Sequence, residues 1–160
     1  MLSLRLVHLI ETHSDQLADT LLRTLATSPE CAELRKLSQD VVRARAYEIY
    51  RNLGDCLMSD TDYEIARRYQ SLGMERAEQG VALSHVVWAI HATKRNLREF
   101  LEREGMTDSP IELNRSLELL QLLDQFFDTA IYHVTLGYER QLSGRSWFPA
   151  TMGGRPWGSP

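Results

Sequence analysis

The chain has 160 residues, of which 43% are hydrophobic and 25% charged, and its formal net charge is −4. This length and composition can bury the core of one globular domain without disulfides or metals. The apolar content excludes a wholly disordered chain. The mild acidity argues against a nucleic-acid binder, because proteins that track phosphates usually carry net positive charge.

The cysteines and the apolar runs predict a cytoplasmic protein with no membrane insertion. Cys31 and Cys56 lie far apart and form no CxxC motif, which is typical of free thiols in a reducing cytosol. The longest uninterrupted apolar run, residues 86–90, has five residues, whereas a transmembrane helix needs about 20. Arg5 and His8 interrupt the apolar opening, and no cleavage site of a signal peptide follows it.

Apolar residues recur every three or four positions along most of the chain, and no strand pattern is present. This spacing predicts an all-α, single-domain bundle of about five helices. The first helix is expected over residues 3–27, followed by a short helical turn with Pro29 at its first position. The second helix is expected from about Ser38 to a stop at Gly54.

The third helix has a clear predicted start and end. Thr61 and Glu64 have the spacing of a capping box, in which each side chain bonds a free amide of the first turn. Gly80 supplies a left-handed cap at the other end. Ala66, Gly73 and Ala77 form a strip of small residues along which another helix can approach closely.

The last two helices are expected from Ser84 to Gly105 and from a second capping box at residues 109–112 to about Leu142. The final helix carries two apolar stripes, more than one core-facing surface needs. We expect one stripe to form a homodimer interface, with burial of both stripes inside one chain as the competing explanation. One stripe comprises Leu113, Leu117, Leu120, Phe127, Ile131, Val134 and Tyr138; the expected interface comprises Leu119, Leu122, Leu123, Phe126 and Ala130.

The helical domain is expected to cover residues 1–143. Residues 144–160 hold four glycines and three prolines without periodicity, which predicts a flexible tail. Its aromatic residues Trp147, Phe148 and Trp157 are candidate anchors for a partner, although a disordered end without a role is the simpler interpretation.

No catalytic constellation, phosphate loop or nucleotide fingerprint is present, and no metal site is predicted. The five histidines include no matched pairs of helical metal ligands. His13, His91 and His133 are candidate haem ligands in a globin-like pocket, whereas a hydrogen-bonded core histidine is the simpler interpretation. Lys94 lies in an apolar stripe and is expected either to pair with an acid or to snorkel. The candidate acids are Glu99, Glu102, Glu104, Asp124 and Asp128.

Three stretches carry a family resemblance: residues 9–18 (LIETHSDQLA), 73–88 (GMERAEQGVALSHVVW) and 126–140 (FFDTAIYHVTLGYER). Together they resemble the N-terminal domain of RsbT co-antagonist proteins of the RsbRD type, over roughly residues 5–142. The resemblance implies an all-α domain that precedes STAS domains, histidine kinases or other outputs in bacterial regulators. Relatives in stress complexes are globin-like without haem, so no cofactor and no catalytic residues are implied.

The resemblance therefore predicts a non-catalytic signal-transduction sensor or regulatory dimerisation module of the stress response. The alternative is a globin-like protein that binds haem or another small ligand. No output domain follows position 142 in this sequence. We accordingly expect either a regulator that signals by binding another protein, or the sensor part of a longer protein.

Overall fold

The computed structural model describes residues 4–104 and 109–147, and these residues form helices and connecting turns with no strand. The all-α prediction is confirmed. The elements of the described ranges are α1 (Leu4–Thr12), α2 (Ser14–Thr27), the 3-10 helix η1 (Pro29–Lys36), α3 (Gln39–Arg51), α4 (Leu53–Met58), α5 (Asp62–Glu78), α6 (Leu83–Glu104) and α7 (Pro110–Trp147).

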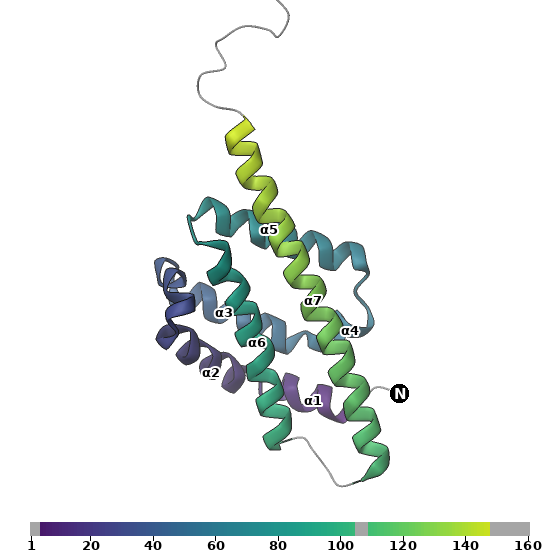
Figure 1. Ribbon diagram of the computed structural model, residues 1–160. Coiled ribbons are helices and arrows are strands. Elements are labelled where there is room, and N and C mark those ends of the chain that lie inside the picture. The colour runs from purple at the N-terminus through teal and green to yellow at the C-terminus, as the bar shows by residue number, and fades with distance from the viewer. Residues whose placement is uncertain (1–3, 105–108, 148–160) are drawn as a thin grey trace, which may run out of the picture.

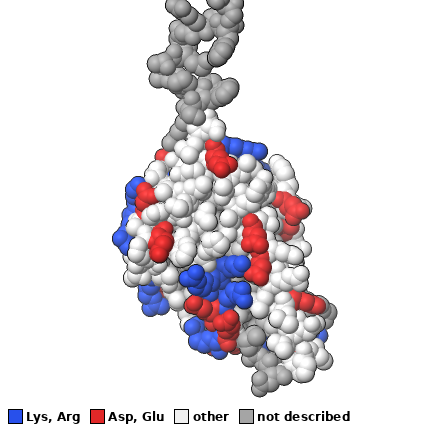
Figure 2. All heavy atoms as spheres, in the orientation of Figure 1, with Lys and Arg blue, Asp and Glu red and all other residues white. Residues whose placement is uncertain are grey.

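Helices α6 and α7 run antiparallel side by side, and α1 to α5 cross behind them (Figure 1). Helix α7 spans the length of the molecule, and its tightest packing is against α5. None of the described helices is both long enough and apolar enough to cross a membrane. Acidic and basic side chains alternate on the face shown in Figure 2.

The first predicted helix is divided at His13, which the apolar spacing did not indicate. The His13 amide donates to the carbonyls of both Leu9 and Ile10, and its Nδ1 lies 2.8 Å from the Leu9 oxygen. The hydroxyl of Ser14, which is buried, donates to the Glu11 carbonyl. These bonds satisfy the end of α1 locally, so α2 can start in a new direction.

The second predicted helix is also divided, but at Asn52, and the expected stop at Gly54 is wrong. Gly54 lies inside α4, where its amide donates to Glu11 Oε1 at 3.0 Å. A Cβ at this position would come within 2.6 Å of that oxygen and 3.1 Å of Val7 Cγ1. Gly54 is therefore a contact point between α4 and α1. These two divisions explain why the described part contains more helices than expected.

The predicted ends of α5 are confirmed. Thr61 Oγ1 accepts from the Glu64 amide, and the Glu64 carboxylate accepts from the Thr61 amide. Gly80 has a φ of +70°, and the Val81 amide reaches back to the Arg76 carbonyl at 3.1 Å. This is the six-to-one hydrogen bond of a Schellman motif. Pro29 occupies the first turn of η1, also as expected.

The turn between α5 and α6 is held by two other elements. The Glu33 carboxylate of η1 accepts from the Ala82 amide at 3.0 Å, and Lys36 donates to the Gly80 carbonyl. From α7, the Tyr138 hydroxyl donates to the Val81 carbonyl at 2.6 Å. The turn thus connects η1, α6 and α7 through polar groups.

Helices α5 and α7 cross at two glycines that face each other's backbone. A Cβ at Gly73 would overlap the Val134 carbonyl oxygen and lie 2.8 Å from the Tyr138 nitrogen. A Cβ at Gly137 would overlap the Gln70 carbonyl oxygen. The predicted close approach along the small-residue strip is confirmed, and α7 is the helix that makes it.

Substituting either crossing glycine tests this contact. We expect Gly73→Ala and Gly137→Ala each to lower the free energy of unfolding by at least about 2 kcal/mol, because the backbones must separate to admit a methyl group. Gly144→Ala is the control, since a Cβ there meets nothing within 4 Å. Denaturant-induced unfolding followed by circular dichroism measures all three. Equal stability of the control and the crossing variants would contradict the close approach.

Candidate functional site

Helix α3 is attached to the rest of the domain along one edge and at its C-terminal end. Arg43 pairs with Asp15 at 3.0 Å and with Asp19 at 2.7 Å, both on α2. The buried Tyr50 hydroxyl donates to the Thr93 carbonyl of α6 at 3.2 Å and accepts from Asn96 Nδ2. Two cavities lie along the side of α3 that faces α5 and the core.

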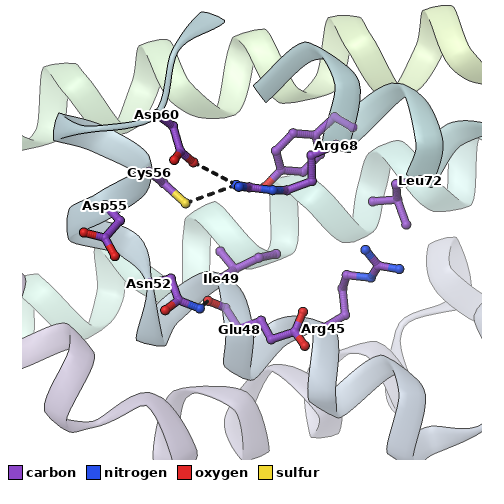
Figure 3. A pocket seen from close by; sticks show the side chains of 10 residues that line it. Arg45, Glu48, Ile49, Asn52, Asp55, Cys56, Asp60, Arg68 and Leu72 are labelled. Carbon is purple, nitrogen blue, oxygen red and sulfur yellow. Dashed lines mark hydrogen bonds and ion pairs between the residues drawn. The ribbon is translucent and has the colours of Figure 1, made fainter. Parts of the chain in front are cut away.

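The outer cavity has a volume of about 350 Å³ and lies between α3, α4 and α5 (Figure 3). Its wall is mixed, with two cationic, three anionic and several apolar side chains. The lining residues are Arg45, Glu48, Ile49, Asn52, Asp55, Cys56, Asp60, Arg68, Tyr69 and Leu72.

Arg68 is committed to partners within the outer cavity. Its Nη1 lies 3.0 Å from Asp60 Oδ2 and 3.4 Å from Cys56 Sγ, as the dashed lines in Figure 3 show. Burial raises the pKa of the Cys56 thiol, although the nearby Arg68 guanidinium acts in the opposite direction. The Cys56 thiol is therefore protonated and uncharged at neutral pH.

The inner cavity, so named because core residues make up much of its lining, is smaller, about 70 Å³. It shares Arg45, Ile49, Tyr69 and Leu72 with the outer cavity, so the two adjoin. Most of its wall is aliphatic or aromatic, contributed by α2, η1, α3, α5, α6 and α7. Further lining residues include Leu21, Leu25, Leu34, Val42, Arg76, Val86, Ala89, Ile90, Thr93, Phe127 and Ala130.

Arg76 is the polar group that distinguishes the inner cavity. Its side chain is only 6% exposed, and its Nη1 donates to Gln79 Oε1 at 2.7 Å and lies 4.0 Å from Glu75 Oε2. The hydrogen bond and the ion pair of Arg76 with described residues both involve Nη1, and Nε and Nη2 are not among the fully buried atoms without a partner. Burial lowers the pKa of Arg76, and the positive charge of Arg45 lowers it further. A guanidinium beside an apolar cavity is a site for an anion.

The three candidate haem ligands do not meet in one place. His13 contacts the Phe100 ring with 5.5 Å between centroids, His91 is exposed on α6, and His133 Nδ1 lies 3.0 Å from Gln70 Nε2. Neither cavity has a histidine in its lining. Among the described residues, no group of three or more His, Cys, Asp or Glu side chains could hold a metal ion.

The expected dimer-interface residues are largely buried in a single chain. Leu119, Leu123, Phe126 and Ala130 are at most 5% exposed, and only Leu122 is half-buried. This interface assignment is wrong for the four buried residues, because they pack inside the domain. The competing explanation fits this stripe, whereas the other stripe has an exposed edge at Leu113 and Leu117.

Two further expectations concern the long helix. Lys94 Nζ lies 2.8 Å from Asp124 Oδ1, so of the two alternatives for Lys94 the structure shows the pairing with an acid, and the partner is on α7. Helix α7 continues past Gly144 to Trp147. The tail residues Phe148 and Trp157 lie outside the described residues.

The inner cavity was not anticipated from the sequence, although one sequence feature pointed to it. Tyr69, Leu72 and Arg76 are spaced three and four apart on α5, so an arginine occupies an apolar helical face. Arg45 had no comparable signal, because its neighbour across the cavity comes from a different helix. Whether the two arginines line the same cavity depends on how α3 and α5 pack.

The buried thiol of Cys31, which lines neither cavity, provides a test of how η1 packs on the core. Burial raises the pKa of Cys31 to about 11, and that of Cys56 in the same direction. Because the thiolate is the reactive form, we expect alkylation of Cys31 at pH 8 to be at least about a hundredfold slower in the native protein than in guanidinium. Mass spectrometry of tryptic peptides measures each rate. Equal rates in the two states would contradict the burial.

Comparison with known proteins gives a family for the chain. The family described as "RsbT co-antagonist protein rsbRD N-terminal domain" matches residues 14–146. The chain matches no curated protein and no solved structure at a significant level. The matched region contains α2 to α6 and nearly all of α7, and thus both cavities. This chain belongs to the RsbT co-antagonist rsbRD N-terminal domain family, whose members are regulatory domains of stress-response signalling.

Proposed function

We propose that this chain is a non-catalytic cytoplasmic sensor and regulatory module of the stress response, and that helix α7 carries its signal. Family membership supports a regulatory role. The structural observation behind the proposal is that one uninterrupted helix, α7, both lines the core and extends beyond it. Helix α7 is buried at Ser116 and Tyr138 and exposed at Leu142 and Gly144. Its last turns extend past the other helices (Figure 1).

A continuous helix transmits displacement because its backbone hydrogen bonds resist bending over a few turns. Helix α7 has 38 residues, which corresponds to about 57 Å at 1.5 Å per residue. Phe127 and Ala130 lie in its middle and line the inner cavity. A change in the packing of the cavity would therefore shift or rotate the end of α7 that an output domain or a partner protein can contact.

Insertions near the end of α7 test this route. Two residues inserted after Ser143 rotate the following helix by about 200°, whereas seven residues restore its face to within about 20°. In a strain lacking the gene, we expect the wild type and the seven-residue insertion to restore stress-dependent expression of a reporter. The two-residue insertion should fail to do so at equal protein level.

The outcomes separate the two parts of the proposal. Equal complementation by both insertions would show that α7 does not transmit the signal. A deletion strain with an unchanged stress response would contradict the regulatory function itself.

We also propose that the module is a homodimer that uses the exposed edge of α7. Leu113 and Leu117 are 45% and 56% exposed, four residues apart on one face of the helix. Exposed apolar side chains at this spacing are typical of helix–helix association. Their position near the start of α7 leaves the opposite end available to a signalling partner.

Sedimentation measures this association. We expect the wild type to sediment as a dimer, and Leu113→Asp combined with Leu117→Asp to sediment as a folded monomer. Val41→Asp is the control, because Val41 is equally exposed but lies on α3. A wild type that is monomeric at high micromolar concentration would contradict the homodimer.

A further inference from the structure

The inner cavity combines an apolar wall with two arginines and no carboxylate. Arg45 and Arg76 are its only charged lining residues, and the remainder of the lining is aliphatic and aromatic apart from Thr93. A cavity that served only as packing space would gain nothing from a buried guanidinium, because removing such a charge from water is costly. The buried guanidinium of Arg76 and the partly exposed one of Arg45 thus give the apolar wall two groups that can bind an anion.

One carboxylate is shared between these two arginines. Glu75 Oε2 lies 3.2 Å from Arg45 Nη2 and 4.0 Å from Arg76 Nη1. The Glu75 side chain is half exposed, so water screens much of its charge. With two formal positive charges and one negative, the three side chains keep one positive charge in excess. The Nε and Nη2 donors of Arg76 form the planar fork that binds carboxylates through two parallel hydrogen bonds.

We propose that the inner cavity binds a small organic carboxylate, whose head lies between Arg45 and Arg76 and whose short apolar group lies against Leu72, Val86 and Phe127. This inference rests on the proposed sensor function and names the class of signal. An engineered cavity of about 150 Å³ holds benzene. At about 70 Å³, the inner cavity accommodates an apolar group of roughly three carbons.

The outer cavity is the less favourable place for the head group. Its lining carries Glu48, Asp55 and Asp60 against Arg68 and against Arg45, which it shares with the inner cavity. Arg68 is already paired with Asp60. Arg76 lines the inner cavity but not the outer one, and the two cavities adjoin through their shared lining.

The proposed ligand would contact the two helices that cross most closely. Leu72 and Arg76 flank Gly73 on α5, and Phe127 and Ala130 belong to α7. Because Gly73 and Gly137 leave no free space at the crossing, the two helices can respond to a ligand only by moving as packed bodies. The ligand would therefore contact α7 near its middle, and the displacement would pass from there along the helix to its C-terminal end.

Binding is tested on the full chain with butyrate as the probe. We expect sodium butyrate to raise the thermal unfolding temperature in a saturable manner, as a ligand of the native state does. Butylammonium chloride and butanol at equal ionic strength are the matched probes of opposite and zero charge, and neither should have this effect. Sodium phosphate tests whether the anion alone suffices. Equal stabilisation by butyrate and phosphate, or by butyrate and butylammonium, would overturn the proposal.

Charge variants locate the head group. We expect Arg76→Gln to weaken butyrate binding, measured by calorimetry, by at least about tenfold, since it removes charge-assisted hydrogen bonds. Arg45→Gln should weaken it in the same direction and tests the site even if Arg76→Gln fails to fold. Arg67→Gln is the control, because Arg67 is exposed on the same helix as Arg76 and lines neither cavity. Unchanged affinity in Arg45→Gln and in folded Arg76→Gln would overturn the site.

A variant that fills the cavity locates the apolar group without changing charge. Ala89 is a partly buried lining residue, and we expect Ala89→Leu to abolish butyrate binding while the protein stays folded. Ala44→Leu on the exposed side of α3 is its control. Retained binding in Ala89→Leu would overturn the placement. Because these experiments measure binding alone, a failure here leaves the complementation experiment as an independent test of the regulatory function.

Discussion

The contact between the backbones of α5 and α7 is the constraint on which the rest of the domain depends. Gly73 and Gly137 each face a carbonyl of the other helix with room for a hydrogen atom only. This approach sets the rotation of α7, so that Phe126 meets the Tyr69 ring edge to face with 5.8 Å between centroids. It also brings the Tyr138 hydroxyl to the turn that starts α6. The crossing thus decides which face of the longest helix is inside.

Helix α3 packs mainly on α2 and has few contacts with α5. Ion pairs of Arg43 join it to α2, and the Tyr50 hydroxyl joins it to α6. The space between these attachments is the pair of cavities. Arg76 reaches the inner cavity because it lies three residues after Gly73 on the same helix, and the crossing holds that helix in register.

In the function proposed for this regulatory domain, the cavity that senses and the helix that transmits would share residues. The chain belongs to a stress-response regulatory family, and its long last helix forms part of the cavity wall. A signal in such a domain needs no catalytic group, since ligand binding alone can shift the balance between two packings. The ion pair of Lys94 with Asp124 joins α6 to α7.

The features that depend on neighbouring residues could be predicted from the amino-acid pattern. Thr61 and Glu64 cap α5 through hydrogen bonds that span three residues, and Gly80 ends it with a left-handed backbone. The all-α class follows from apolar spacing along each helix. Three features depend on tertiary packing. They are the positions at which the long helices divide, the choice of the buried stripe of α7, and the presence of Arg76 and Arg45 in the lining of one cavity. Both stripes of α7 are apolar, so periodicity could not rank them, and the choice came from the glycine crossing, whose two halves are 64 residues apart (137 minus 73).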